Sequence, residues 1–404
     1  MVKKYIFLLA IVLLVISMLT GCWSRKELNE LAITTAIGID KSEDGLLLSA
    51  QVVNPGEVAG QEAATNRTPV TVYTETADTI FEAIRKMSTI SPRKLYFAHL
   101  RMVVISEEFA EEVGINKLLD FLSRDHELRT DFYIIVARES RAEEVVKTLA
   151  HGEDISANKL FSSLEVSEKV WAPTISIALD ELIADIVSDG KHPVLTGVRL
   201  IGDAAIGKTQ KNVESTNSPA TLRYSTIAMF KNDKLISWLN EKESVGFQYV
   251  VGHVQSTVEQ VKCSKGGNLV LEVIRTKPDV TGEVENGKPK IKVDLFVEAN
   301  VGEVQCKIDL TKTKTIEELD KKLSEVIKNN IEESVKKAKE EGVDIFGFGE
   351  AIHRSNPKEW KKLKTNWGET FKKITVNIEV DAHIRRTGTV GNSFLEETGK
   401  DKEK

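Results

Sequence analysis

The sequence predicts an α+β fold with mixed β-sheets flanked by helices, divided into about three domains. At 404 residues the chain is too long for one hydrophobic core. In the first half, segments of branched and aromatic residues alternate with amphipathic segments, which indicates a mixed or partly parallel sheet with helices on its faces. In the second half, three consecutive strand segments precede one long amphipathic helix.

Residues 1–21 are predicted to be a lipoprotein signal peptide. Their apolar segment, residues 6–19, follows two lysines and is shorter than the ~20 residues that a membrane-spanning helix needs. A lipid-attachment signal places small residues before a Cys, because the peptidase fits the backbone closely there. The expected recognition residues are Leu19, Thr20 and Gly21, and the expected lipid attachment residue is Cys22. The alternative is an uncleaved N-terminal anchor with a chance Cys.

Lipid attachment would hold the mature body at the outer face of a cytoplasmic membrane. A single acyl chain binds a bilayer only weakly, whereas two chains on one Cys anchor it stably. No segment after residue 21 is long and apolar enough to span a bilayer. The net charge of −6 is small for this length and argues against nucleic acid as a partner, since such proteins carry a basic face.

An N-terminal α+β region of one or two subdomains is expected over residues 22–205. Its strands are predicted at residues 32–40, 45–53, 70–76, 95–105, 131–137 and 193–201. Its helices are predicted at residues 78–87, from 106, around 115–122, and at 142–150, 159–170 and 174–187. Asp78 can cap the first of these helices, and Pro173 suits the start of the last because a missing N–H costs nothing there.

Residues 206–221 are predicted to be a linker. They hold Asn, Ser, Thr and Pro, and residues 207–221 lack an apolar pattern. A C-terminal α+β domain is expected over residues 222–385, and a disordered polar tail over 386–404. The predicted strands of this domain are residues 223–231, 235–239, 254–261, 269–275, 290–301, 305–310 and 374–384. Its predicted helices are residues 244–251, 315–338, 344–353 and 358–367.

The longest predicted helix, residues 315–338, carries apolar residues at spacings of three and four, with Lys and Glu elsewhere. Such a stripe should pack on a sheet with the charged side in water. Asn330 interrupts the stripe, which argues against a free coiled coil.

Two cysteines remain once Cys22 is assigned to lipid. Cys263 and Cys306 could pair in an oxidising compartment, but one pair does not make a disulfide scaffold. We expect two separate thiols, with pairing as the alternative.

No motif in the sequence indicates catalysis. A zinc-protease helix motif, a P-loop and a nucleophile elbow are all missing. Gly347 and Gly349 keep only part of a dinucleotide-binding fingerprint, and a tight turn between helices explains them. Residues 151–154 (His-Gly-Glu-Asp) offer one imidazole, which is little for a metal.

Several polar and aromatic residues have an ordinary structural interpretation. Asp180, Glu181 and Asp185 share one helix, where a solvated face is more usual than acid–base work. His99 lies in an apolar segment and is interpreted as a core residue. Trp238, Trp360 and Trp367 are interpreted as core or interface anchors. We therefore expect no enzyme activity, no metal and no cofactor beyond the covalent lipid on Cys22.

Three blocks of residues, in order along the chain, resemble one family. The first block is Leu19-Thr20-Gly21-Cys22-Trp23 with Glu27-Leu28-Asn29-Glu30-Leu31 and Gly38-Ile39-Asp40. The second is residues 230–235 (FKNDKL), followed by Trp238-Leu239, Glu243-Ser244 and Gly246. The third is residues 344–350 (DIFGFGE), followed by His353, Pro357 and Trp360. Together they resemble the Ger(x)C-type spore germination lipoproteins, the C subunits of nutrient germinant receptors in spore-forming Firmicutes.

This resemblance implies an α+β protein of about three domains with no assigned enzyme activity. It also implies a complex with two integral membrane partners, the A and B subunits of the receptor, in the inner membrane of a dormant spore. The C subunit is implied to be needed for receptor assembly or function, with nutrient binding placed on the membrane subunits.

Two further classes of function remain as alternatives. A ligand-capturing, solute-binding-like lipoprotein would need a cleft between two similar lobes, and the two halves here look different. An envelope hydrolase would need a nucleophile or a metal site, and no pattern in the sequence supplies one.

Overall fold

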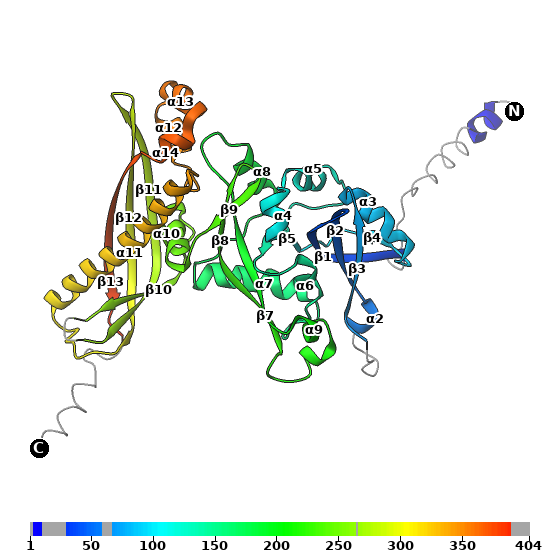
Figure 1. Cartoon of the computed structure of the whole chain (residues 1–404), viewed down its shortest axis with the longest axis horizontal. Helices are drawn as coiled ribbons and strands as arrows, with labels where there is room; N and C mark the ends of the chain where they lie inside the picture. Colours follow the sequence, from blue (N-terminus) through cyan, green and yellow to red (C-terminus); the bar gives the residue numbers. More distant parts are fainter. Residues whose placement is uncertain (1–2, 10–29, 59–66, 264–265, 389–404) are drawn as a thin grey trace, which may run out of the picture.

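The computed structural model describes residues 3–9, 30–58, 67–263 and 266–388. A nine-stranded mixed sheet and a four-stranded sheet, each flanked by helices, form an elongated molecule (Figure 1). The predicted α+β class is therefore confirmed. Within the described ranges no helix combines the length and the apolar character needed to cross a membrane.

The larger sheet has the order β3-β2-β1-β5-β6-β7-β8-β9, with β4 beside β1. Strands β1, β5, β6 and β7 run parallel, and the others in this order are antiparallel to their neighbours. Its strands are β1 (Leu31–Ser42), β2 (Gly45–Val53), β3 (Val70–Ala77), β4 (Lys94–Tyr96), β5 (Met102–Ser106), β6 (Tyr133–Ala137), β7 (Val194–Gly202), β8 (Ala220–Lys231) and β9 (Lys234–Trp238).

Helices cover both faces of this sheet, as the alternating sequence pattern predicts. Buried residues of α3, α4, α5 and α8 pack on one face, and those of α6 and α7 on the other. The helices of this region are α2 (Pro55–Val58), α3 (Ile80–Lys86), α4 (Glu107–Glu112), α5 (Asn116–Arg124), α6 (Ala142–Lys147), α7 (Ser156–Val170), α8 (Leu179–Val187) and α9 (Ala204–Gly207), with short 3-10 turns η2 (Met87–Thr89) and η3 (Gln210–Asn212).

The single strand predicted at residues 95–105 is wrong. The chain bends there, so that β4 and β5 pair with different stretches of β1. His99 lies exposed in the bend, beside the ring of Tyr96, and is not a core residue. The first turn of α3 is capped by Thr79 rather than by Asp78, since the Thr79 side chain accepts a hydrogen bond from the N–H of Glu82.

The helix predicted from residue 174 starts five residues later, at Leu179. Residues 174–177 are instead extended and cross an end of the sheet: the N–H of Ile134 donates to the carbonyl of Ile177 at 3.1 Å. Thr196 Oγ1 accepts a hydrogen bond from the N–H of Ile175 and donates one to its carbonyl. Pro173 therefore precedes an extended segment, because these main-chain groups are bonded to the sheet.

The larger sheet continues across residues 206–221. β7 and β8 pair antiparallel on either side of this segment, with Gly202 opposite Ala220. Asn212, in the middle of it, is fully buried and donates to the carbonyls of Leu149 and Ala220. The segment thus joins neighbouring strands of one sheet, and the second sheet begins only after β9.

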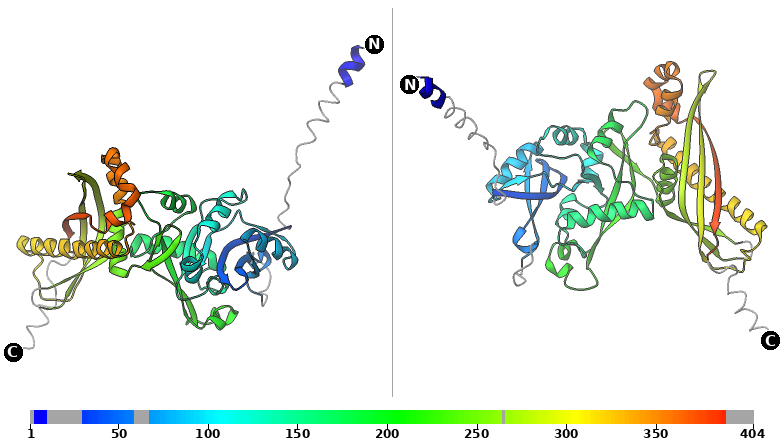
Figure 2. Two further views of the ribbon diagram at one scale, coloured as in Figure 1. Left: turned by 45° about the horizontal axis from the view of Figure 1, so that its top comes forward. Right: turned by 180° about the vertical axis from the view of Figure 1, so that it is seen from behind.

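The smaller sheet has the order β10-β11-β12-β13 and lies at the opposite end of the molecule from β1 (Figure 2). Its strands are β10 (Thr257–Lys262), β11 (Asn268–Glu285), β12 (Lys288–Val304) and β13 (Thr375–Arg386). The helices around it are α10 (Glu241–Val251), α11 (Thr313–Glu341), α12 (Phe348–Ser355), α13 (Pro357–Leu363) and α14 (Trp367–Phe371), with the 3-10 turn η4 (Lys364–Asn366). No strand forms at residues 305–310, where the chain turns from β12 toward α11.

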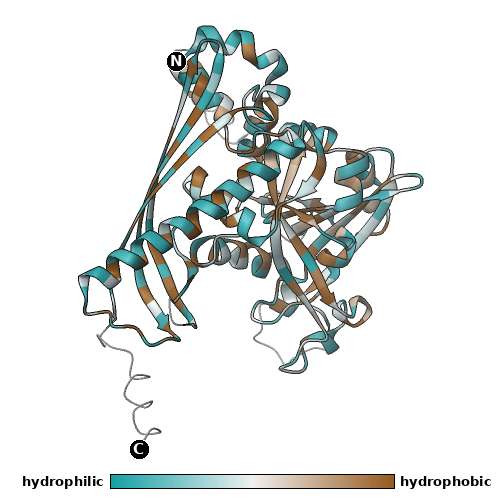
Figure 3. Cartoon of the chain, turned by 60° about the vertical axis from the view of Figure 1, so that its left-hand side comes forward, coloured by the Kyte–Doolittle hydropathy of each residue, from teal (hydrophilic) through white to brown (hydrophobic). Residues whose placement is uncertain are grey.

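The long helix α11 lies across the smaller sheet, as its apolar stripe predicts (Figure 3). Asn330 does not break the packing: it is buried and donates to both carboxyl oxygens of Glu259 on β10 at 3.2 and 3.4 Å.

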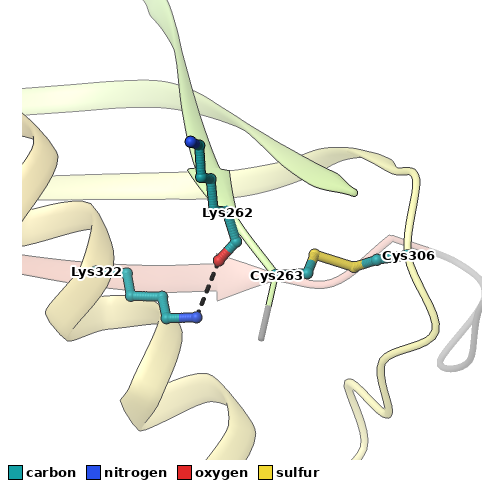
Figure 4. The surroundings of a disulfide bond; sticks show 4 residues. All are labelled: Lys262, Cys263, Cys306 and Lys322. Carbon is teal, nitrogen blue, oxygen red and sulfur yellow. Dashed lines mark hydrogen bonds between the residues drawn. A yellow bond between two sulfur atoms is a disulfide. The ribbon is translucent and has the colours of Figure 1, made fainter. Parts of the chain in front are cut away.

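Cys263 and Cys306 form a disulfide, with their Cα atoms 6.4 Å apart, so the expectation of two separate thiols is wrong (Figure 4). Residue spacing gave no reason to pair them, because the contact depends on β10 and the end of β12 meeting through β11.

Candidate functional site

The third sequence block lies where the two sheets meet. Asp344 follows α11 and is fully buried. Its Oδ1 accepts from the N–H of Phe348 at 3.1 Å, and its Oδ2 accepts from the N–H of Gly349 at 2.7 Å and from Trp367 Nε1 at 3.0 Å. Burial raises the pKa of Asp344 to about 6, against the opposing effect of these hydrogen bonds. The carboxylate therefore organises the start of α12 and holds α14 against it.

His192, just before β7, joins the larger sheet to Asp344. The main-chain N–H of His192 donates to the Asp344 carbonyl at 2.7 Å. The ring nitrogen Nδ1 of His192 accepts from the main-chain N–H of Asp344 at 3.1 Å. Burial, helped by the charge of Lys231, lowers the pKa of His192 to about 4, so the ring is neutral at pH 7, and the N–H that Asp344 donates to Nδ1 requires the ring proton to lie on Nε2. Two hydrogen bonds therefore join His192, beside the larger sheet, to Asp344, which follows α11 of the smaller sheet's unit.

Two glycines bring the halves into direct backbone contact. A Cβ atom on Gly349 would lie 2.7 Å from the Gly190 Cα and 2.6 Å from Trp360. A Cβ atom on Gly190 would lie 2.7 Å from the Glu350 nitrogen. Real Cβ atoms do not approach this closely, so both positions require a residue without a side chain.

Polar pairs surround this contact, and all their residues except Glu350 line a small cavity of about 350 Å³. The pairs are Ser188 with Glu350 at 2.8 Å, Lys191 with Asp185 at 2.9 Å and Lys364 with Asp189 at 2.7 Å. The first and third join the larger sheet's region to α12 and η4. We call the contact formed by residues 185–193 with residues 344–350 and 360–369 the joint.

The second sequence block forms the start of α10 and packs this helix against α11. Asn240 and Glu243 form a reciprocal cap at the start of α10. Gly246 lets α10 press on α11, because a Cβ there would lie 2.1 Å from the Asn330 carbonyl oxygen. From the same helix, Gln248 is buried and donates to the carbonyl of Thr174 beneath the larger sheet.

The first block is only partly described. Leu19, Thr20, Gly21, Cys22 and Trp23 lie outside the described residues, so lipid attachment remains a prediction. Asp40, at the end of β1, accepts from the N–H groups of Ala142 and Glu143 at 2.8 Å each, and so caps α6. Burial raises its pKa. This carboxylate is structural, because both its oxygens are occupied.

The other polar candidates do not assemble into a site. Residues 151–154 are exposed loop positions, and no group of three potential metal ligands occurs among the residues that the structure describes. Asp180 is exposed, Glu181 is half-buried and Asp185 is bound to Lys191. Burial is the main cause that raises the pKa values of Glu181 and Asp185.

The tryptophans are anchors, as interpreted from the sequence. Trp360 and Trp367 are buried and meet edge-on at 5.1 Å in the joint. Trp238 is half-buried, and its Nε1 donates to Glu107 at 2.6 Å.

Sequence reasoning missed the larger sheet's contribution to the joint. Ser188, Gly190, Lys191 and His192 follow α8 in a stretch whose only visible signal is the Asp189-Gly190 helix end. The partners of Ser188, Gly190 and His192 lie more than 150 residues away in the chain, and no local pattern encodes such a contact.

Comparison with known proteins gives matches over nearly the whole chain. The family model described as "Spore germination protein N-terminal domain" matches residues 24–200, and that described as "Spore germination B3/GerAC like, C-terminal" matches residues 225–388. The predicted linker lies between the two matches, although the larger sheet spans it.

Curated relatives come from Bacillus subtilis (strain 168). Spore germination protein KC is 34% identical over 97% of this chain and 98% of its own length. Spore germination protein A3 is 26% identical, over 93% and 96% respectively. The crystal structure of the GerBC protein superposes with a TM-score of 0.53 at 18% identity, over 86% of this chain and 96% of that one, and so shares the fold.

The two family-model matches and the match to protein KC over 97% of the chain lead to one assignment, in agreement with the three sequence blocks. The chain belongs to the Ger(x)C-type family of spore germination proteins, the C subunits of germinant receptors.

Proposed function

We propose that this protein is the lipid-anchored C subunit of a spore nutrient germinant receptor and acts as a non-enzymatic interaction subunit. Diacylglycerol on Cys22, with a further acyl chain, holds it at the outer face of the cytoplasmic membrane, which is the inner membrane of the spore. There it docks on the integral membrane A and B subunits and is needed for their assembly or function. Tethering raises the effective concentration of the body near these partners, so a modest interface suffices.

One observation carries the proposal: the residues of the second and third sequence blocks pack parts of the chain against one another. Gly349 and Gly246 lie against other parts of the chain. Both carboxylate oxygens of Asp344 accept hydrogen bonds from N–H groups of the chain itself. A body built in this way presents outer surfaces to partners. The Cys263–Cys306 disulfide supports a location outside the cytoplasm, where such bonds persist.

The test is replacement of Cys22 by Ala in the full chain. The variant should lose the lipid, leave the membrane fraction and reduce germination, while its body keeps the melting temperature of the parent. Mass spectrometry of the native N-terminus reads the modification directly. Membrane partitioning that stays unchanged in the variant contradicts the anchor.

Partner binding needs its own measurement. The solubilised A and B subunits should be recovered with the lipidated chain and not with an unrelated lipoprotein used as a control. Recovery of the chain without them, from membranes that contain both, contradicts the interaction role.

A ligand-capturing lipoprotein is a second candidate, since the cavity in the joint is polar and carries both charge signs. Against it, the two units are unlike, with nine and four strands respectively, and Lys191 and Lys364 are already paired. A germinant that raises the melting temperature of the isolated chain would favour this candidate, since binding to the folded state stabilises it by mass action.

A further inference from the structure

The first half of β8 is an open edge of the larger sheet. β9 pairs only with residues 228–231 of β8, and Leu239 extends that contact to the carbonyl of Ile227. Residues 220–226 therefore have β7 on one side and, within the described ranges, no strand on the other. An open edge is a template for pairing with another chain.

The carbonyl of Leu222 shows which main-chain groups point outward. It accepts from Lys159 Nζ at 2.9 Å, so it faces α7 and not β7. In an antiparallel pair, alternate residues turn both their main-chain groups away from the partner strand. Leu222 and Tyr224 are such residues, and in the described chain neither the Leu222 N–H nor the main-chain groups of Tyr224 have a partner on this side.

The chain closes this edge at one end only. The side chain of Asn212 accepts from the N–H of Ala220 at 2.8 Å and donates to its carbonyl at 3.0 Å. The Asn212 side-chain amide therefore bonds both main-chain groups of Ala220, as a neighbouring strand would. From Leu222 to Thr226 nothing comparable is present in the part of the chain that the structure describes.

A groove of about 490 Å³ runs between this edge and α7. Lys159, Ser163, Ser167 and Trp171 line it from the helix side, and residues 221–226 line it from the strand side. Six residues of strand extend about 20 Å, which suits a short extended segment. The Trp171 side chain, 44% exposed at the groove, offers an apolar surface to such a segment.

The groove has an excess of positive charge. Lys159 and Arg223 have no carboxylate within 4.0 Å in the described chain, while Glu241 is the one acidic residue among those that line the groove. Burial lowers the pKa of Lys159, as expected for an ammonium group without a counter-ion. A carboxylate from outside would supply the missing partner.

We infer that this edge takes up an extended, acidic segment of a partner protein as an additional strand beside β8. The Leu222 N–H and the main-chain groups of Tyr224 bond the main chain of the segment, Lys159 and Arg223 meet its carboxylates, and Trp171 packs on one apolar side chain. Main-chain pairing provides affinity and the flanking side chains provide specificity. The inference rests on the proposed function, because it takes the partner to be a membrane subunit of the receptor.

The test places a photo-crosslinking amino acid at Ser163, in the full lipidated chain in spore membranes. Ser162 is the matched control, because it is exposed on the same helix and does not line the groove. Light should link position 163, and not position 162, to a membrane subunit at a stretch that contains Asp or Glu. Lys159→Met should weaken this capture roughly tenfold, the scale of one charge-assisted hydrogen bond, while Lys159→Arg retains it.

Hydrogen exchange gives a readout that is independent of crosslinking. The amides of Leu222 and Tyr224 should exchange more slowly in the assembled receptor than in the free chain, whereas that of Arg223, which already faces β7, should not change. Crosslinks to a second copy of this chain, or none at position 163 while the subunits are recovered, overturn the inference and leave the proposed function standing. Loss of the subunits from every variant, including the control, overturns both.

Discussion

The Cα of Gly190 lies 2.7 Å from the point where a side chain of Gly349 would begin. The two residues are 159 positions apart, and they belong to the two units that carry different sheets. Their contact leaves no room for a methyl group, and Trp360 closes the remaining side. The two backbones are therefore closely packed at this point of the joint, and the contact requires glycine at both positions.

Gly349→Ala should destabilise the protein by about 1–3 kcal/mol, the usual cost of overpacking a core. The sign is informative, since Gly349 lies in α12 and Ala would otherwise favour a helix by about 1 kcal/mol. Urea unfolding of the full chain measures the effect. Gly302→Ala is the control, because a Cβ there would meet nothing closer than 3.6 Å. Equal stability of both variants would contradict the contact.

Asp344→Asn should loosen the joint without unfolding either sheet. The carboxylate accepts from three N–H donors, and Asn replaces one acceptor oxygen with a donor group. At least one buried N–H is then unsatisfied, at a cost of about 1–3 kcal/mol. Faster amide exchange at Phe348 and Gly349, with that of the β11–β12 hairpin unchanged, is the expected signature. Exchange rates that match the parent protein at both positions would exclude this role.

Local structure was largely predictable, because it depends on neighbouring residues. The hairpin of β1 and β2, the Asn286-Gly287 turn between β11 and β12, and the stripe of α11 follow from alternation, turn chemistry and helical spacing. The third block identified residues of the joint on the C-terminal side. None of these signals depends on a distant part of the chain.

Distant contacts were not predictable. The pairing of β7 with β8 across a polar segment, and the meeting of His192 with Asp344, depend on how complete sheets pack. A polar segment was interpreted as a linker because it lacks an apolar pattern, yet Asn212 shows that such a segment can be buried when its amide is fully bonded. Asn330 was correctly interpreted as evidence against a free coiled coil, but its hydrogen bonds to Glu259 could not be predicted, since Glu259 lies on another element.

Glu259 should make stability depend on pH. Burial raises its pKa to about 7 in the folded protein, although Tyr249 and Asn330 donate to its carboxyl group. The folded state therefore holds the proton more tightly than the unfolded chain. This stabilisation is complete below pH 4.5 and is lost as the pH rises through 7, by about 3 kcal/mol. Asp344, with its pKa raised to about 6, acts in the same direction.

Glu259→Gln should flatten this dependence. Gln carries no titrating proton and keeps one oxygen to accept from Tyr249 or Asn330, so the variant should gain stability relative to the parent between pH 5 and pH 8. Unfolding free energies at the two pH values give the difference. Glu272→Gln, at an exposed position on β11, should leave the slope unchanged. A parent-like slope in Glu259→Gln would show that another group is responsible.

Reduction of the Cys263–Cys306 disulfide should weaken the smaller sheet's unit. The bond joins the end of β10 to the segment after β12 and closes a loop between residues 43 positions apart. In the chain-entropy account a loop of this size contributes about 4 kcal/mol, by restricting the unfolded chain. The double variant Cys263→Ala/Cys306→Ala should therefore melt below the parent, and a reductant should lower the parent's melting temperature while leaving the variant's unchanged.

Alkylation before and after reduction, mapped by mass spectrometry, verifies the bond itself, since both residues should be labelled only after reduction. Labelling of Cys263 and Cys306 in the unreduced protein would contradict the disulfide. The end of β10 would then be held by non-covalent contacts, such as the hydrogen bond from Lys322 Nζ to the Lys262 carbonyl.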